Sequence, residues 1–302
     1  MTPLVSFITP TYNTAHYLRK TIDSILAQTY PNIEYIVLDD GSTDNTLDIL
    51  KSYGDRIVWD SHPNMGETRT VNKGFGMAKG DYIVVVSADD PVKPNLAEVG
   101  VQWMERHPEA LIGYPDWDTI DSQGEVITTH KLLDYDYEIM TRMHYCLPNA
   151  GTIIRRRVLE LETGRDPNYR YVGDYEFFLR VGLHSPFVHI PETLATWRSH
   201  PGSVSVNSKN EAMALENIRC VEKLYERTDL LEAVKKAKPE ALSTAYYMAG
   251  LILMPDFEAA RPYFLQSIRH HPFAPHAYPT GLLRSRKYLL CALLPFLRRF
   301  LL

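Results

Sequence analysis

VSFITPTYNTAHYLRKTIDSILAQTYPNIEYIVLDDGSTDNTLDIL, residues 5–50 of the chain, is the stretch that decides the fold. Its β-branched and aromatic residues gather into short apolar runs, and between these runs the apolar residues recur with the period of a helix. After the first run, Leu18, Ile22, Ile25 and Leu26 fall on one helical face. The stretch therefore predicts four elements in turn: a strand at 5–9, a helix through Leu18–Leu26, a strand at 33–38 and a helix at 43–50.

The same alternation continues to residue 86, with a strand predicted at 57–59, a helix at 66–78 and a strand at 82–86. Strands that are separated by single helices form right-handed crossovers. The chain is therefore predicted to be an α/β protein with a Rossmann-like, mostly parallel sheet and flanking helices. Ligands of such sheets bind beyond the carboxyl ends of the strands. Three polar clusters follow predicted strands and are expected to meet at that edge: Pro10–Asn13, Asp39–Ser42 and Ser87–Asp90.

Two pairs of adjacent carboxylates lie in these clusters. Asp39 and Asp40 stand where a strand ends and a helix begins, and a single side-chain oxygen would suffice to cap that helix. Asp89 and Asp90 directly follow the fourth strand, and adjacent carboxylates repel each other unless a positive charge lies between them. Mg²⁺ usually binds one or two carboxylates together with phosphate oxygens. We therefore interpret the second pair as a site for a divalent cation and phosphates; a solvated turn is the alternative.

Two later residues are candidates for chemistry. Asp174 stands near the start of a predicted helix, where it is either a cap or a general base that takes a proton from a reacting hydroxyl. His200 follows in the segment WRSHPGSVS, residues 197–205. A single loop histidine is usually structural, but here Arg198 and His200 could face phosphates, with His200 as a metal ligand.

The pattern changes near residue 205. Before it, residues 91–205 mix helices, short strands and loops, and a strand pair is expected at 187–190 and 194–197. After it the pattern is helical, with pieces near 209–236, 239–253, 256–270 and 280–302, and the pair around 240–270 is predicted to form an antiparallel hairpin. We thus predict an α/β domain at 1–205 and an α-helical C-terminal extension at 206–302.

The composition is that of a globular protein, with 45% hydrophobic residues and a net charge of −5, which gives no reason to expect a nucleic-acid partner. Three widely spaced cysteines and an N-terminus without a signal-peptide pattern predict a cytoplasmic protein. From Pro275 onward Lys and Arg occur without Asp or Glu, while the apolar run Tyr288–Leu297 is shorter than the ~20 residues of a membrane span. Residues 284–302 are predicted to contact the inner face of a membrane peripherally; packing against the preceding helices is the alternative.

Taken in order, these motifs resemble those of family 2 inverting glycosyltransferases. Residues 5–50 resemble the opening of that family, and four further motifs follow in its order: Asn64–Gly74 with its two Asn-x-Gly pairs, Asp89–Pro94, the helix of Asp174, and Arg198–Ser205. The resemblance covers about residues 4–205. It implies a GT-A fold with a nucleotide-binding half at 1–110 and an acceptor half at 111–205. It also implies a nucleotide-sugar donor, most often UDP-linked, and Mg²⁺ or Mn²⁺ as the cofactor.

The resemblance further implies roles for single residues. The nucleotide would contact Pro10, Thr11, Tyr12, Asp39, Asp40 and Asp89. The metal would be held by Asp89, Asp90 and His200, and Asp174 would be the catalytic base. Three positions depart from the residues usual in the family: Ser87 replaces an Asp, Gly173 a Glu and Val71 an Arg. The first leaves the metal geometry open, and the second leaves Glu176 as the only other acid near Asp174.

The expected function is inverting transfer of a sugar from a nucleotide-sugar donor to a hydroxyl of a glycan or lipid-linked acceptor, as in polysaccharide biosynthesis. A catalytically silent nucleotide-sugar-binding or adaptor protein on the same fold is the alternative, because a fold alone does not determine activity. The presence of Asp89, Asp90 and Asp174 together favours the enzyme.

Overall fold

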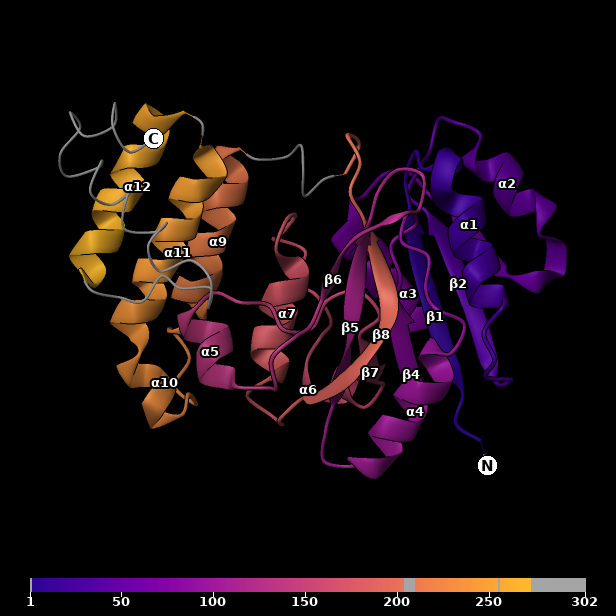
Figure 1. Cartoon of the computed structure of the whole chain (residues 1–302), viewed down its shortest axis with the longest axis horizontal. Coiled ribbons are helices and arrows are strands. Elements are labelled where there is room, and N and C mark those ends of the chain that lie inside the picture. The colour runs from indigo at the N-terminus through magenta and orange to yellow at the C-terminus, as the bar shows by residue number, and fades with distance from the viewer. Residues whose placement is uncertain (1, 204–209, 255, 273–302) are drawn as a thin grey trace. The chain divides into compact units, whose positions relative to one another are not determined.

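The computed structural model describes residues 2–203, 210–254 and 256–272, which fall into two compact units (Figure 1). The first unit contains Met1–Tyr135 and Leu147–Ser203, and the second contains Asp136–Cys146 together with the helices that follow Ser203. The chain thus leaves the first unit at Tyr135 and returns to it at Leu147. That excursion was not predicted from the sequence.

The described elements alternate between strands and helices in the first unit and are helical in the second. The strands are β1 (Val5–Thr11), β2 (Ile33–Asp39), β3 (Val58–Ser61), β4 (Tyr82–Val85), β5 (Ile112–Ile120), β6 (Val126–His130), β7 (Ile153–Arg155) and β8 (Val188–Arg198). The helices of the first unit are α1 (Ala15–Leu26), α2 (Thr46–Ser52), α3 (Glu67–Met77), α4 (Leu96–Arg106), α6 (Val158–Leu161) and α7 (Gly173–Val181), with a 3-10 turn η1 (Gly54–Arg56). The second unit contains α5 (Tyr137–Arg142), α9 (Glu211–Leu224), α10 (Glu232–Lys236), α11 (Lys238–Leu253) and α12 (Phe257–His270).

Within the described residues the first unit is built on an eight-stranded sheet of order β3-β2-β1-β4-β7-β5-β6, with β8 paired to β5. The strands β1 to β4 run parallel, β7 is antiparallel to β4, and β8 runs parallel to β5. The predicted Rossmann-like, mostly parallel sheet with flanking helices is therefore confirmed. Thr11 pairs with Asp39, and Asp39 pairs with Ser61, so the ends of three strands lie side by side at one edge.

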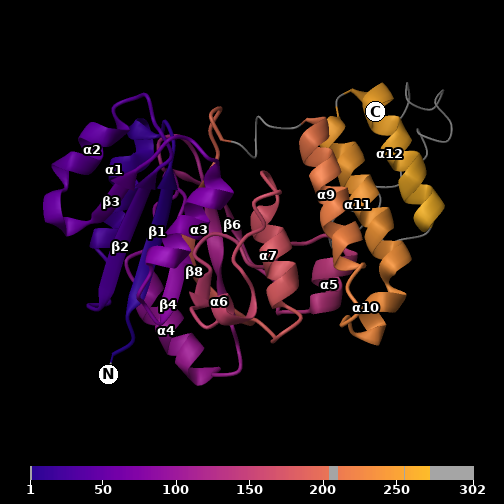
Figure 2. The same ribbon diagram turned by 180° about the vertical axis from the view of Figure 1, so that it is seen from behind.

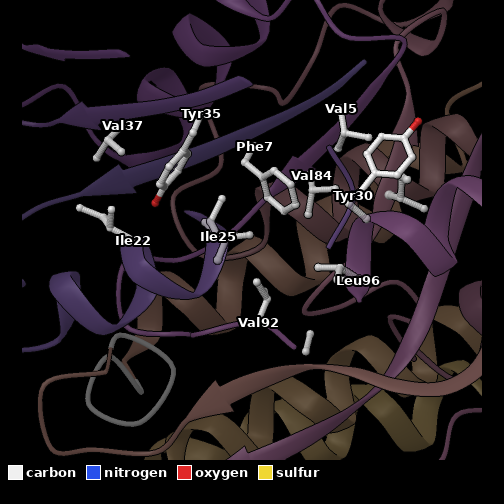
Figure 3. Close-up of a cluster of buried hydrophobic side chains, with 14 of the residues drawn as sticks. Val5, Phe7, Ile22, Ile25, Tyr30, Tyr35, Val37, Val84, Val92 and Leu96 are labelled. Atoms are coloured by element: carbon white, nitrogen blue, oxygen red, sulfur yellow. The ribbon is translucent and has the colours of Figure 1, made fainter. Parts of the chain in front are cut away.

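The two faces of the parallel strands are covered by different helices, as Figure 1 and the reverse view in Figure 2 show. One face packs Phe7, Tyr35 and Val84 against Ile22 and Ile25 of α1, in a cluster that also includes residues of α4 (Figure 3). The other face lies against α3, where Gly74 approaches so closely that a Cβ atom would lie 2.5 Å from Ile8 Cγ2. Glycine at this position is required by packing.

Two expected boundaries are wrong. The strand pair expected at 187–190 and 194–197 is the single strand β8, whose register against β5 shifts on either side of Asp116. Pro191 cannot donate a ladder hydrogen bond, and the first shift lets the chain pass it without ending the strand. The helix expected at 209–236 is instead two helices. The first, α9, ends at Leu224, the second, α10, begins at Glu232, and the connection between them contains an Arg227–Asp229 ion pair of 2.6 Å.

The second unit packs its helices around small residues. Ala241 and Ala245 of α11 lie against Val221 of α9, and Gly250 lies against Phe264 of α12, where a Cβ atom would be 2.5 Å from the ring. The helical hairpin expected around 240–270 is formed by α11 and α12. Among the described residues, no helix combines the length and the apolar character needed to cross a membrane. The segment 284–302, expected to contact a membrane, lies outside the described residues.

Candidate functional site

The loops that follow β1 and β2 are joined to each other by hydrogen bonds. Asn13 adopts a positive φ of 52°, its backbone N–H donates to Ser42 Oγ at 2.8 Å, and its side-chain oxygen accepts from the N–H of Thr43 at 2.8 Å. Asp44 accepts from the N–H of Ala15 at 3.0 Å, which connects the second loop to the start of α1. Two of the three predicted polar clusters therefore form one connected rim at the carboxyl edge of the sheet.

The first carboxylate pair is buried beneath that rim. Asp39 is fully buried and accepts from Ser61 Oγ at 2.7 Å and from the N–H of Ser42 at 3.2 Å. Asp40 is 4% exposed and accepts from the N–H of Met65 at 2.7 Å and of Gly66 at 3.0 Å. Each carboxylate satisfies backbone donors that no helix or strand satisfies. Both residues predicted to contact a nucleotide therefore shape the loops that surround its expected position.

The predicted nucleotide-contacting residues of the first cluster differ in accessibility. Tyr12 is 49% exposed, whereas Thr11 is 2% exposed and its hydroxyl pairs with Thr14 Oγ1 at 2.6 Å. Pro10 is partly buried. Of these three, Tyr12 offers the largest accessible surface to a bound base.

The second carboxylate pair meets His200, which lies 111 residues further along the chain than Asp89. His200 Nε2 is 2.9 Å from Asp89 Oδ2, and the two side chains are 10% and 21% exposed. The N–H of Gly202 donates to His200 Nδ1 at 3.1 Å, so the proton of the neutral ring is assigned to Nε2, from which it donates to Asp89. The structure thus joins the predicted residues Asp89 and His200 at the carboxyl end of β4.

Asp90 lies behind this pair. It is 7% exposed, and its Oδ1 accepts from the backbone N–H of Arg198 at 2.6 Å. Burial, followed by the negative charge of Asp89, raises the pKa of the Asp90 carboxyl well above its usual range, and hydrogen bonds from Arg198 and Ser87 oppose that rise. A second full negative charge directly beside Asp89 is therefore disfavoured at this strand end.

Asp89, whose side chain is 21% exposed, fits one ligand of a divalent cation, whereas His200 in this arrangement engages both ring nitrogens in hydrogen bonds and stands beside it. Asp90, the third predicted ligand, is occupied on one oxygen by Arg198. In the part of the chain that the structure describes, no group of three or more His, Cys, Asp or Glu side chains is placed to hold a metal by itself. A cation held here would have to complete its coordination with phosphate oxygens and water, which is how Mg²⁺ commonly binds.

Asp174 lies in the first turn of α7 and is exposed, while its neighbours Gly173 and Tyr175 are buried. The start of α7 lies close to the start of α3, because a Cβ atom on Gly173 would lie 3.1 Å from Thr68 Oγ1, which also donates to the carbonyl of Tyr169 at 2.8 Å. A Glu at position 173 would crowd this contact. Since Asp40 holds the loop before α3, Asp174 stands on the same side of the fold as the rim.

Glu176, the other acid near Asp174, has a structural role. It is 4% exposed, and its two carboxylate oxygens accept from Arg180 Nε and Nη2 at 2.8 and 3.0 Å. Arg180 also donates to Glu162 at 2.6 Å. This network of hydrogen bonds engages both oxygens of the Glu176 carboxylate and withdraws it from solvent. Asp174 is therefore the accessible acid of this helix start.

Sequence reasoning left the roles of two residues undecided. Asn72 bonds the backbone of Arg165 in both directions, accepting from its N–H at 2.9 Å and donating to its carbonyl at 2.7 Å. This pair connects α3 to the segment that precedes α7. Arg198, which could have faced phosphates, is 1% exposed and lies among backbone carbonyls. Neither arrangement has a local sequence signal, because both depend on long-range packing.

Residues 6–154 match the family described as "Glycosyl transferase family 2". An uncharacterized glycosyltransferase of Rickettsia prowazekii is 31% identical over 224 residues, which cover 72% of this chain and 70% of that protein. The chondroitin synthase of Pasteurella multocida is 27% identical over 210 residues, 68% of this chain and 22% of that enzyme.

Solved structures with low sequence identity share the fold. The crystal structure of Staphylococcus aureus TarS 1–349 in complex with UDP-GlcNAc has a TM-score of 0.70 at 16% identity, covering 95% of this chain and 88% of that one. The mannosyltransferase PcManGT of Pyrobaculum calidifontis, in complex with GDP-Man and Mn²⁺, has a TM-score of 0.60 at 16% identity, covering 99% and 88%. The predicted GT-A architecture is thereby confirmed.

Proposed function

This chain belongs to glycosyl transferase family 2 and is a glycosyltransferase with a nucleotide-sugar-binding fold, and from that premise we propose that it transfers a sugar with inversion from a UDP-sugar. The acceptor is a hydroxyl of a glycan or of a lipid-linked saccharide. TarS is similar in fold and was solved with UDP-GlcNAc, which supports this donor class. The mannosyltransferase of similar fold was solved with GDP-Man, so GDP-sugars are the donors with which UDP-sugars should be compared.

The contact between Asp89 and His200 carries the proposal. Two residues separated by 111 positions meet at 2.9 Å at the carboxyl end of β4, where ligands of parallel sheets bind. Asp89 would hold Mg²⁺ or Mn²⁺, with His200 as its neighbour, and Asp90 would support the site from behind. The cation would supply positive charge to the departing nucleotide diphosphate.

Asp174 is the proposed base. It accepts the proton of the acceptor hydroxyl, and the hydroxyl oxygen then forms a bond to the anomeric carbon of the sugar. The bond between that carbon and the diphosphate oxygen breaks, and the nucleotide diphosphate leaves with the electron pair. A single displacement inverts the anomeric centre. Catalysis of this kind depends on positioning and electrostatics, and this chain would provide both through the Asp89–His200 pair and Asp174.

A donor panel tests the proposal. UDP-, GDP- and dTDP-sugars would be incubated with the protein and Mn²⁺, with release of nucleotide and the anomeric form of the freed or transferred sugar followed by NMR. We expect release from a UDP-sugar, inversion at the anomeric carbon, and loss of release in Asp89→Ala. Binding of UDP-sugars without any turnover, across a panel of glycan acceptors, would instead favour the silent binding protein. Retention of configuration would refute the single displacement.

A further inference from the structure

Arg198 is a buried arginine whose side chain contacts the backbone of the proposed site. Its Nε donates to the carbonyl of Asp89 at 2.8 Å, and its Nη1 donates to the carbonyl of Asp121 at 2.8 Å. Its own backbone N–H donates to Asp90 Oδ1. One residue at the end of β8 therefore holds both members of the carboxylate pair and the turn between β5 and β6.

Tyr17 of α1 connects the same guanidinium to His200. The guanidinium carbon of Arg198 lies 4.8 Å from the centroid of the Tyr17 ring, and the His200 ring lies 4.6 Å from that centroid. Since His200 also contacts Asp89, four residues close a ring of contacts: Arg198, Asp89, His200 and Tyr17. These four residues come from α1, the end of β4, the end of β8 and the loop that follows β8.

Packing alone does not explain an arginine at this place. The residue is 1% exposed, and its Nη2 has no hydrogen-bond partner among the described residues. Burying an arginine and leaving one of its donors unsatisfied costs free energy that an apolar side chain of similar volume would not cost. Unlike an apolar side chain, the guanidinium donates hydrogen bonds to fixed carbonyls and packs against the face of the Tyr17 ring.

We propose that Arg198 and Tyr17 are positioning residues that hold the Asp89–His200 pair in the orientation in which it meets the donor diphosphate. Arg198 fixes the peptide group of Asp89 and thereby the direction of its side chain. Tyr17 fixes the plane of the His200 ring. The inference rests on the proposed function for the identity of the ligand, while the orientation of the pair is a property of the free protein.

The chain offers a matched control. Arg155 is partly buried, donates to the carbonyls of Ala110 and Met104 at 3.2 and 2.8 Å and to the Tyr82 hydroxyl at 3.0 Å, and its guanidinium carbon lies 5.1 Å from the ring centroid of Tyr82. It thus repeats the structural chemistry of Arg198 at β7, away from the Asp89–His200 pair. Replacing either arginine by methionine removes two hydrogen bonds to carbonyls and a contact with a tyrosine ring, so an effect on His200 confined to Arg198→Met reports on the site.

The first test observes His200 directly in the free protein. In ¹⁵N-histidine-labelled protein, the two ring nitrogens of His200 are identified among eleven histidines by their absence from the spectrum of His200→Asn. We expect a protonated Nε2 and an acceptor Nδ1 in the wild type and in Arg155→Met. In Arg198→Met these signals should shift or broaden toward an average of two tautomers. Unchanged His200 signals in a folded Arg198→Met protein would overturn the proposal.

A second pair of variants keeps the test decisive if Arg198→Met does not fold. Tyr17→Leu removes the ring, whereas Tyr17→Phe retains it and removes only the hydroxyl. We expect Tyr17→Leu to change the His200 signals and Tyr17→Phe to leave them as in the wild type. Identical His200 signals in these two variants and the wild type would contradict the proposal that the Tyr17 ring orients His200.

Turnover gives the functional readout. With the donor found active in the panel, Arg198→Met and Arg198→Lys should lose about 10- to 100-fold in kcat, because small displacements of catalytic groups have effects of that size. Lysine has one compact ammonium and lacks the planar fork by which Arg198 reaches the carbonyls of Asp89 and Asp121 from two different nitrogens. Arg155→Met should lose activity only in proportion to its loss of folded protein. If no donor is turned over by the wild type, the proposed function fails, while the His200 spectra still decide whether Arg198 positions the pair.

Discussion

Glu176 and Arg180, one helical turn apart in α7, are joined by two hydrogen bonds of 2.8 and 3.0 Å. This bidentate pair occupies both oxygens of the acid that could have replaced Asp174 as a base. It also shows why the exposed Asp174, two residues earlier, is the position to test first.

Asp174→Asn should keep the fold and the affinity for donor nucleotide but lose transfer by about 100-fold or more, because only the proton acceptor is removed. Glu176→Gln should instead lower the stability of the fold and retain transfer. It leaves the partly buried Arg180 beside a neutral amide, and we expect a lower melting temperature with residual transfer. Thermal unfolding and transfer rates on the two purified variants distinguish the two roles, and near wild-type transfer in Asp174→Asn would exclude it as the base.

Asp89→Ala should remove the dependence of nucleotide affinity on Mn²⁺. We expect wild-type protein to bind UDP more tightly with Mn²⁺ than with EDTA in calorimetric titrations, and Asp89→Ala to bind equally weakly in both. Asp60→Ala serves as the control. It removes a half-exposed carboxylate of β3 that pairs with Lys73, and it should still bind UDP more tightly with Mn²⁺ than with EDTA. Equal UDP affinity with and without Mn²⁺ in the wild type would argue against a metal at Asp89.

Asp40→Asn should destabilise the protein, since the N–H groups of Met65 and Gly66 donate to different carboxylate oxygens and the amide replaces one of these oxygens by an NH₂ group, which cannot accept. An unsatisfied buried donor costs about 1–3 kcal/mol, and we expect a decrease of that size in the free energy of unfolding by urea. Asp48→Asn changes an exposed carboxylate in a 3.6 Å pair with Lys51 and should leave stability within about 0.5 kcal/mol. Equal stabilities of the two variants would contradict the loop-holding role of Asp40.

His144 in the second unit should make stability depend on pH. It is buried, its Nε2 is 2.6 Å from Asn217 Oδ1, and burial lowers its pKa from 6.5 to about 4, against the opposing effect of that hydrogen bond. As pH falls from 6.5 toward 4, the unfolded chain binds a proton that the folded chain does not, so folding is progressively disfavoured. The stabilisation at neutral pH relative to pH 4 is of the order of 3 kcal/mol.

The measurement for His144 is the free energy of unfolding between pH 4 and 7, in parallel for the wild type and His144→Asn. Asparagine tolerates the positive φ of 51° found at this position and removes the titrating group. The variant should show a shallower decline below pH 6.5 than the wild type. Parallel curves would show that His144 does not contribute to the acid sensitivity.

Much of the fold could be predicted from residues 5–86, because strand and helix periods are local properties of the chain and alternate there without interruption. The positions of Asp40 and Asp89 at strand ends follow from the same pattern. The carboxyl edge of a parallel sheet then brings such residues together. The boundaries that were wrong, in β8 and between α9 and α10, lie where a bulge or a short connection interrupts an otherwise continuous pattern.

The sequence by itself determined the α/β class, the order of the motifs and the edge at which they gather, since each depends on neighbours a few residues apart. Only the tertiary structure decided which acids remain accessible. Asp39 and Asp40 are enclosed by loops, Glu176 is held by Arg180, and Asp174 stays exposed. It also decided that Arg198 is buried behind Asp89 and that His200 reaches it. Such contacts join positions about 100 residues apart, so they depend on strand register and helix packing, which no local pattern specifies.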